Sequence, residues 1–480
     1  MQQSPTPMKR RRRLDTLRYQ ATDFVVAMIA WACFFAYRKH LVEAQAIDVA
    51  LFSDVNFYLG IFLVPTGWML FYAIFDQYKD IYRLSRLATL TRTLFLSFFG
   101  VLFLFFTLVL DDFVTGYQTY YRSFAVLFGL HFVLTATARM IVLTRASRRL
   151  KKNLVTYRTL LVGSGERASE LYHDIAGRKY GLGYNFVGLL EDPAQPPGPV
   201  AGSLPRLGDL SELETVLREH DIEEVIIALE AEQHPRLRGL LNVLFLYSDM
   251  VLVKIIPDLY DILLGSVQMN HVFGAVLIEI KQDLMPRWQR LVKRLVDIVA
   301  SAVLLLLLLP LYAWCALRVR ASSPGPIFFR QERVGLNGQP FEIIKFRSMY
   351  TDAEARGPQL SKADDPRCTP WGAVMRKWRL DEIPQFWNVL KGDMSLVGPR
   401  PERRHFIDLI TEQAPHYRHL LKVRPGITSW GQVKFGYAGS VEEMLDRLQF
   451  DILYIENMSL GLDLKIMFYT LLVLVRGEGK

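Results

Sequence analysis

The sequence predicts a multidomain integral membrane protein that joins a four-helix transmembrane bundle to two α/β domains, and three observations support this fold class. Four apolar runs of membrane-spanning length fill the first third of the 480-residue chain. The middle third opens with a glycine-rich turn between a strand pattern and a helix pattern. A fifth apolar run, interrupted by Pro310, precedes a basic last third. Hydrophobic residues are 51% and charged residues 22% of the chain, which excludes both a disordered chain and a pure membrane bundle.

The charge and the cysteines restrict the partners and the compartment. Lys and Arg outnumber Asp and Glu by 57 to 48, which gives a net charge of +9 and suits anionic partners such as nucleotides, phospholipids or lipid phosphates. The three cysteines (Cys33, Cys315 and Cys368) lie far apart without a CxxC pair. Neither a disulfide framework nor a zinc site is therefore expected, and isolated thiols fit a reducing cytoplasm.

The four apolar runs cover about residues 22–41, 56–76, 90–110 and 121–144. About 20 helical residues cross a hydrocarbon core of about 30 Å. Basic residues precede the first run, lie between the second and third, and follow the fourth, whereas the other two loops carry the acids Glu43, Asp48, Asp54, Asp111 and Asp112. This alternation predicts a four-helix transmembrane domain at residues 1–152 with both ends in the cytoplasm. We expect no cleaved signal peptide, because the first run is long and lacks a small-residue cleavage site. The alternative is a soluble protein with four buried helices.

Residues 153–285 have the pattern of a Rossmann-like α/β cytoplasmic domain, with a strand, a turn and a helix from Tyr157 onward and two further strands. Gly163, Gly165 and Ala168 form a GxGxxA turn that could present helix amides to a phosphate, and Glu191 and Asp192 follow the next strand, where an acid could meet a ribose. The alternative is that the glycines merely permit a tight turn. No tyrosine of this unit has a lysine four residues later, which argues against redox or epimerase chemistry.

The fifth apolar run begins at Leu291 and has basic residues on both sides, so the positive-inside rule gives it no direction. Proline lacks a backbone donor and kinks a helix. The sequence therefore predicts a re-entrant membrane helix kinked at Pro310, which enters and leaves by the same leaflet. A full crossing that exports the C-terminal domain is the open alternative.

The last domain, residues 286–480, holds two groups of residues suited to chemistry. Two strand-like segments carry the cations Arg330, Arg333, Lys345 and Arg347, which match phosphate oxygens. Asp381 and Glu382 are adjacent, with Arg376 before them and Arg400 after them. On a helix such carboxylates point about 100° apart, so they can serve one metal ion or divide nucleophile and support roles. The plainer alternatives are a solvated basic face and ordinary surface acids. A C-terminal helix, residues 448–475, could lie along a membrane surface.

Six segments of this domain carry a family resemblance: KRLVDIVAS (293–301), SPGPIFFRQERVG (323–335), KFRSM (345–349), DDPR (364–367), LDEIPQFWNVLKGDMSLVGPRP (380–401) and RPGITSWGQV (424–433). In this order they resemble the signature of bacterial polyprenyl-phosphate sugar-1-phosphate transferases. With its bundle and middle domain, the chain resembles the large form of that family, similar to undecaprenyl-phosphate glucose and galactose phosphotransferases. One departure is Leu309, which stands where the family commonly has serine before the kink proline.

The resemblance implies an enzyme of the bacterial inner membrane, with its catalytic domain on the cytoplasmic face. It would transfer a hexose-1-phosphate from a UDP-sugar to undecaprenyl (polyprenyl) phosphate, release UMP and initiate exopolysaccharide, O-antigen (lipopolysaccharide) or capsule synthesis. The implied nucleophile is Asp381, through a covalent aspartyl-phosphosugar intermediate, with Glu382 as its partner. Mg²⁺ is the implied cofactor, held by Asp381 and Glu382.

The expected partners are the UDP-sugar, polyprenyl phosphate and the lipid bilayer, and no nucleic acid is expected. A homodimer is compatible with this interpretation. Lys293 and Arg294 are expected to bind the lipid phosphate, because they lie where the re-entrant helix meets the interface. The full set of expected substrate-binding residues is Lys293, Arg294, Arg330, Arg333, Lys345, Arg347, Arg376, Pro399, Arg400 and Pro401.

Two other hypotheses belong to different functional classes. One is a regulatory or scaffold protein whose middle domain senses a nucleotide, and the intact Asp381–Glu382 pair disfavours it. The other is a membrane-anchored nucleotide-sugar dehydratase, disfavoured by the missing Tyr-Lys pair. Release of UMP from UDP-sugars separates all three hypotheses.

Overall fold

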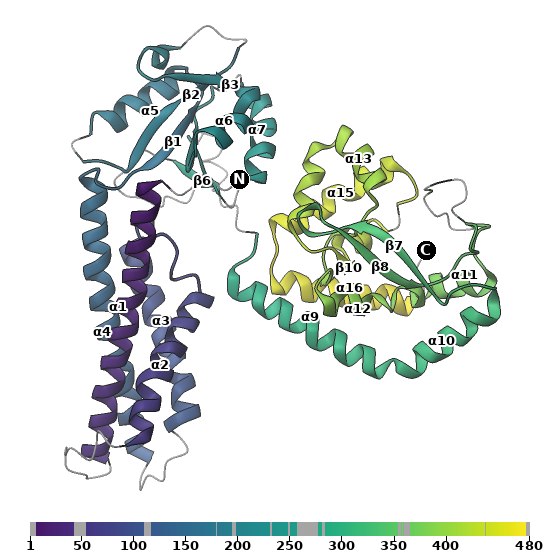
Figure 1. Ribbon diagram of the computed structural model, residues 1–480, viewed down its shortest axis with the longest axis horizontal. Coiled ribbons are helices and arrows are strands. Elements are labelled where there is room, and N and C mark those ends of the chain that lie inside the picture. The colour runs from purple at the N-terminus through teal and green to yellow at the C-terminus, as the bar shows by residue number, and fades with distance from the viewer. Residues whose placement is uncertain are drawn as a thin grey trace. The chain divides into compact units, whose positions relative to one another are not determined.

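A computed structural model describes residues 6–42, 54–109, 117–178, 180–193, 198–230, 233–247, 250–256, 277–280, 284–353, 357, 359, 365–436 and 438–476. Of the residues named above, Glu43, Asp48, Asp111, Asp112 and Asp364 lie outside these ranges. The chain divides into two compact units (Figure 1). The first unit comprises Met1–Gln233 and Val251–Ile280, and the second comprises His234–Met250 and Lys281–Lys480.

The first unit contains four helices that are long and apolar enough to cross a membrane, and they lie where the sequence predicts four spans. They are α1 (Pro7–Tyr37), α2 (Val55–Ile74), α3 (Arg86–Leu104) and α4 (Tyr117–Lys151). Their shared core is rich in aromatic side chains, among them Trp31, Phe34 and Trp68. Between these helices, Arg139 donates two hydrogen bonds to Asp23, at 2.7 and 3.1 Å. Both side chains are buried, and a buried charge is stable only when it is paired in this way.

A six-stranded mixed sheet with strand order β3-β2-β1-β4-β5-β6 follows the bundle, and its strands are parallel except for β6. Leu160, Leu161, Val225 and Ile226 in the central strands are fully buried, as expected for parallel strands covered on both faces. The strands are β1 (Tyr157–Val162), β2 (Tyr184–Glu191), β3 (Arg206–Asp209), β4 (Glu224–Ile227), β5 (Leu252–Ile255) and β6 (Ile278–Ile280). The helical segments are α5 (Glu166–Ala176), Pro199–Gly202, Leu210–Glu212 and α6 (Leu213–Glu219).

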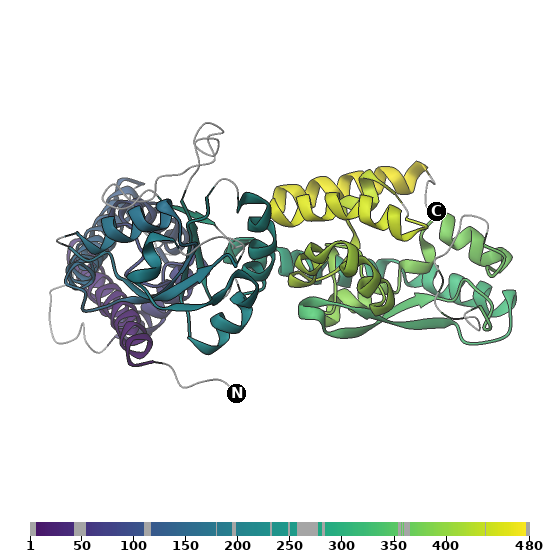
Figure 2. The same ribbon diagram turned by 90° about the horizontal axis from the view of Figure 1, so that it is seen from above.

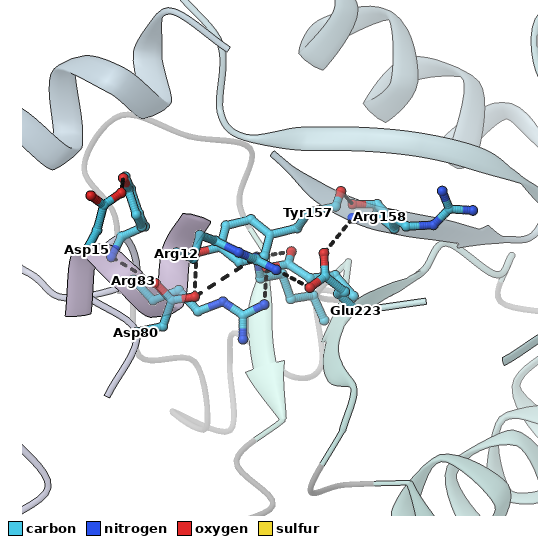
Figure 3. Close-up of polar contacts among 11 residues, drawn as sticks. Arg12, Asp15, Asp80, Arg83, Tyr157, Arg158 and Glu223 are labelled. Atoms are coloured by element: carbon cyan, nitrogen blue, oxygen red, sulfur yellow. Dashed lines mark hydrogen bonds and ion pairs between the residues drawn. The ribbon is translucent and has the colours of Figure 1, made fainter. Parts of the chain in front are cut away.

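The amino-terminal ends of β1 and β4 contact the end of the bundle formed by the start of α1 and the α2–α3 connection (Figure 3). Arg12 pairs with Glu223, and Arg83 Nη2 lies 2.8 Å from Glu224 Oε1. The Tyr157 ring packs against both guanidinium groups, with Arg12 Cζ at 4.1 Å and Arg83 Cζ at 4.4 Å from its centroid. Tyr157 also donates a hydrogen bond to Asp80 at 2.8 Å. These contacts are why the bundle and the sheet form one unit.

The second unit begins with α9 (Arg287–Leu307) and α10 (Leu309–Ser322), which form a pair bent by 63° (Figure 1). The helix breaks at Leu308, two residues before the predicted position at Pro310. The physical reason is that proline fits the first turn of a new helix, where its missing N–H would have no partner, and disrupts the turn that precedes it. Both helices expose large apolar side chains, including Leu295, Leu306, Leu307, Leu309 and Leu317.

The rest of the second unit surrounds a hairpin of β7 (Phe328–Val334) and β8 (Pro340–Phe346) and a short parallel pair of β9 (Ser395–Val397) and β10 (Gly426–Thr428). In Figure 2 the C-terminal helices lie along one side of this unit and the hairpin along the other. A core that includes Phe406, Leu448 and Tyr454 holds these parts together. The helical segments are α7 (His234–Leu246), Leu336–Gly338, α11 (Pro370–Lys377), Leu380–Glu382, α12 (Gln385–Lys391), α13 (Arg404–Gln413), Pro415–Lys422, α14 (Trp430–Lys434), α15 (Val441–Glu456) and α16 (Leu460–Arg476).

Candidate functional site

Asp381 and Glu382 lie in a single 3₁₀ turn between α11 and α12, and each is 7% exposed. Arg379, the residue before this turn, has a left-handed backbone conformation with φ of 56°. Such a conformation is uncommon for a residue other than glycine and stores strain of about 1–3 kcal/mol, which is typical of functional sites. A 3₁₀ turn has three residues per turn, so adjacent side chains diverge by about 120°. The two carboxylates therefore meet different surroundings.

Glu382 is neutralised by three cations from three parts of the unit. Its Oε1 lies 2.8 Å from Lys345 Nζ of β8 and 3.3 Å from Arg400 Nη2 of the loop after β9. Its Oε2 lies 3.6 Å from Arg379 Nη1. Burial by itself raises the pKa of Glu382, but Lys345, Arg400 and Arg379 outweigh burial and hold that pKa well below its usual range. Glu382 is therefore ionised throughout the physiological pH range.

Asp381 is electrostatically different from its neighbour. Within the described part of the chain, no side chain lies within hydrogen-bonding or salt-bridge distance of its carboxylate. Burial and then the Glu382 charge raise the pKa of Asp381 to about 6, against the opposing influence of Lys345, Arg376 and Arg379. At neutral pH Asp381 is thus mostly ionised, poorly solvated and not held by a partner, which are the properties of an available nucleophile.

Both carboxylates face a cavity of about 310 Å³ lined by cations and aromatic rings. Such a lining suits an anionic ligand with a flat or apolar part. The cavity brings together seven of the residues singled out from the sequence: Arg333, Lys345, Arg347, Arg376, Asp381, Glu382 and Arg400. Aromatic side chains on its wall are Phe328, Phe329, Phe346, Tyr350 and Phe406.

Three of the lining cations are held by contacts with other parts of the unit. Arg347 Nη2 donates to the Ser323 carbonyl at 2.6 Å, which fixes the segment that leads into β7. Arg333 donates to the Pro401 carbonyl at 3.1 Å and to Glu402 at 3.4 Å. Arg447 of α15 donates to the other Glu402 oxygen at 2.7 Å. These contacts tie the hairpin, the loop after β9 and α15 into one rigid wall.

Sequence reasoning did not place Arg379, Glu402, Arg403 or Arg447 in the site. Two of these residues could have been identified from their place in the sequence. Arg379 lies three residues before Glu382, and Glu402 directly follows the GPRP segment. Arg447 could not have been identified in this way, since it belongs to a helix far along the chain and reaches the cavity only through tertiary packing.

Five predicted substrate-binding residues do not line the cavity. Arg330 is exposed on the hairpin and lies 3.6 Å from Glu342. Pro399 and Pro401 flank Arg400, and the Pro399 carbonyl accepts a hydrogen bond from Gly426 at 2.9 Å. The two prolines thus shape the loop that carries Arg400.

Lys293 and Arg294 of α9 have partners within the protein. Lys293 Nζ donates to the Val397 carbonyl at 2.8 Å and to Asp463 at 2.7 Å. Arg294 donates to the Val389 and Leu390 carbonyls at 2.7 and 2.9 Å, at the carboxyl end of α12. Their predicted contact with a lipid phosphate stays a prediction.

Asp381 offers open carboxylate oxygens to a divalent cation, whereas both oxygens of the adjacent Glu382 already pair with cations. Among the described residues, no group of three or more His, Cys, Asp or Glu side chains converges on one point. Mg²⁺ usually takes only one or two carboxylates and completes its shell with water and substrate phosphates. The open Asp381 oxygens beside Glu382 fit that kind of site, in which the substrate supplies the remaining ligands.

Comparison with known proteins is consistent with this geometry. Residues 288–477 match the family described as bacterial sugar transferase, and residues 77–257 match the family described as CoA-binding domain. An uncharacterized sugar transferase of Bacillus subtilis is 40% identical over 189 residues, which are 39% of this chain and 90% of that protein. The fold and the site thus define a membrane protein with a transferase domain, and the chain belongs to the bacterial sugar transferase family.

Two further relatives carry more specific names. The UDP-N-acetylgalactosamine-undecaprenyl-phosphate N-acetylgalactosaminephosphotransferase of Aeromonas hydrophila is 41% identical over 225 residues, covering 47% of this chain and 52% of that protein. The UDP-glucose:undecaprenyl-phosphate glucose-1-phosphate transferase of Xanthomonas campestris is 36% identical over 324 residues, covering 65% of each chain. The matches therefore span between about half and two thirds of these relatives.

Proposed function

We propose that this protein transfers a hexose-1-phosphate from a UDP-sugar to undecaprenyl phosphate and releases UMP. The observation that carries the proposal is the pair of unlike carboxylates, in which Glu382 is neutralised by cations and Asp381 is open to a cationic cavity. The names of the relatives support the donor and the acceptor. In the cell the reaction would take place at the cytoplasmic face of the bacterial inner membrane. It would initiate exopolysaccharide, O-antigen or capsule synthesis.

In the first step, an Asp381 carboxylate oxygen attacks the phosphorus that bears the sugar. A new O–P bond forms, the P–O bond to UMP breaks, and its electron pair leaves on the UMP phosphate. Arg376, Arg379 and Arg400 lie where they can stabilise the charge of the pyrophosphate during this displacement. Glu382 is a poor candidate for the attack, because its charge is already shared among Lys345, Arg400 and Arg379.

Asp381 and Glu382 are the residues that would hold Mg²⁺ together with the pyrophosphate. When bound, the metal reduces the repulsion between the carboxylate and the phosphate. Glu382 also keeps Lys345 and Arg400 next to the reacting carboxylate, so the protein itself supplies part of that charge compensation.

In the second step, a phosphate oxygen of undecaprenyl phosphate attacks the same phosphorus, and Asp381 leaves as a free carboxylate. The product is a polyprenyl diphosphate sugar. This step requires the cavity to lie next to the membrane. The apolar residues exposed on α9 and α10 support such a position, because they can contact lipid. The 63° bend between these helices supports a re-entrant arrangement that enters and leaves one leaflet.

Mass spectrometry tests the covalent step directly. The full-length protein in detergent is mixed with Mg²⁺ and a panel of UDP-hexoses, without lipid acceptor, and quenched. We expect a hexose-phosphate adduct on the peptide that contains Asp381, together with stoichiometric UMP, and neither product in Asp381→Asn. Asp393→Asn is a matched control, because Asp393 lies in the same motif but does not line the cavity. Release of UMP by Asp381→Asn at the wild-type rate would rule out Asp381 as the nucleophile.

A further inference from the structure

The GxGxxA turn of the first unit contacts the protein's own chain at both glycines. Gly163 has φ of +111°, and a Cβ added there would lie 2.4 Å from the Ala228 carbonyl oxygen. A Cβ added to Gly165 would lie 2.5 Å from Glu230 Oε1. The Ala228 carbonyl therefore explains why residue 163 must be glycine, with no need for a bound nucleotide, and Gly165 lets the Glu230 side chain approach the turn.

The Glu230 carboxylate occupies the amino-terminal end of α5, which begins just after Gly165. Its Oε1 accepts a hydrogen bond from the Arg167 backbone N–H at 3.0 Å, and its Oε2 lies 3.6 Å from Arg167 Nε. The first amides of a helix lack partners within the helix and attract anions. An internal carboxylate thus takes the position that a dinucleotide phosphate takes in proteins that use such a turn.

Neighbouring contacts close the same edge of the sheet. Gln233 accepts a hydrogen bond from the Glu230 backbone N–H at 3.1 Å, and its Nε2 lies 3.4 Å from Asp192 Oδ2. Asp192 is 6% exposed, so the acid expected to meet a ribose is packed inside the protein. A Cβ at Gly198 would lie 1.8 Å from the Ser164 carbonyl oxygen, which brings a second connection onto the turn.

We propose that the phosphate-binding turn of this α/β domain is closed in cis by Glu230, as an autoinhibitory contact. Nucleoside diphosphates and coenzyme A are excluded while Glu230 is in place, because their phosphates would need the same amide and would meet a like charge. The proposal is independent of the transferase reaction, since it concerns residues of the other unit. The similarity to CoA-binding domains then reflects a shared fold with a filled site.

Hydrogen exchange of the full-length protein in detergent tests the proposal. Exchange in the peptide covering residues 163–170 is followed in phosphate, in chloride of equal ionic strength and with coenzyme A. Wild-type protein should exchange slowly and respond to neither phosphate nor coenzyme A. Glu230→Ala should exchange about tenfold faster, the effect of losing one charge-assisted hydrogen bond, and phosphate should slow it again.

Two further variants control for general loosening. Glu212→Ala removes another carboxylate of this domain, which accepts from the Asp209 backbone N–H at 2.9 Å, and should change exchange only near residue 209. Glu230→Gln keeps the size and an acceptor oxygen, so its exchange should rise above wild type but less than in Glu230→Ala. Protection of the wild-type turn by phosphate or coenzyme A would overturn the proposal. Equal exchange in wild type and both Glu230 variants would also overturn it.

Discussion

Lys345 Nζ lies 2.8 Å from Glu382 Oε1, and this contact separates the roles of the two adjacent carboxylates. Lys345 lies near the carboxyl end of β8, and Arg400 lies in the loop after β9. Both side chains reach the 3₁₀ turn that holds Glu382. Both cations reach Glu382 and leave the Asp381 oxygens facing the cavity. Of these two adjacent acidic residues, Glu382 thus serves as a structural anion and Asp381 as a reactive anion.

The two carboxylates should affect stability in opposite directions. The pKa of Asp381 is raised to about 6, so the fold favours its protonated form, and that contribution is present at low pH and lost as the pH rises through 6. At pH 7.5 the ionised Asp381 should therefore destabilise the fold by at most about 3 kcal/mol. Asp381→Asn should raise the apparent melting temperature by several degrees at pH 7.5 and by less at pH 5.

Glu382→Gln is the counterpart of that variant. It removes the carboxylate that pairs with the largely buried Lys345, and removing one partner of a buried ion pair destabilises a fold by up to about 3–5 kcal/mol. Its melting temperature should fall. Differential scanning fluorimetry of the detergent-solubilised proteins measures both shifts, and shifts of equal sign would contradict the assignment of charge to the two residues.

The pH dependence of UMP release should report the Asp381 carboxylate. Without lipid acceptor, kcat/KM for the UDP-sugar should decrease about tenfold per pH unit below pH 6, because only the ionised nucleophile reacts. Raising the Mg²⁺ concentration should move this decrease to lower pH, since a bound cation favours the carboxylate form. A rate that stays constant down to pH 5 would contradict the raised pKa. A midpoint that does not respond to Mg²⁺ would argue against Asp381 as a metal ligand.

Arg12 and Arg13 should behave differently although they are adjacent in one basic cluster. Arg12 is buried and pairs with Glu223, whereas Arg13 is exposed. Arg12→Ala leaves Glu223 buried without its cation and should destabilise the first unit by about 3–5 kcal/mol. Arg13→Ala removes one positive charge from the same basic cluster and should have almost no effect on stability. The double variant with Glu223→Gln should recover part of the loss, and equal melting temperatures for the two single variants would show that the junction contributes nothing.

Arg294→Ala distinguishes a structural role from a lipid-binding role. Arg294 donates to the last carbonyls of α12, the helix that follows the Asp381–Glu382 turn. From this contact we expect UMP release and transfer to lipid to fall by the same factor, about tenfold for two lost hydrogen bonds to a charged group. Arg330→Ala, on the exposed hairpin, is the control of matched charge. A loss restricted to the lipid step would favour the predicted headgroup contact.

The features that the sequence predicted correctly depend on local properties. Membrane spans follow from hydropathy summed over about 20 residues, so the four helices were recognisable from composition alone. The bend near Pro310 follows from the covalent structure of proline, although the break itself falls at Leu308. The Asp381–Glu382 pair stands out in the sequence because its neighbours form a continuous motif, and its catalytic role stays a prediction.

Only the tertiary structure decided which partner each charged side chain meets. Lys345 with Glu382, Arg447 with Glu402 and Arg12 with Glu223 each join residues from separate elements. Arg330 matched the charge pattern of the cavity as well as Arg333 did, yet only Arg333 lines it, because alternate strand residues point to opposite faces. Glu230 likewise reaches the glycine-rich turn only through the packing of the folded chain. A charge is visible in a sequence, but the energy of its interaction depends on distance and burial, which only the packed chain determines.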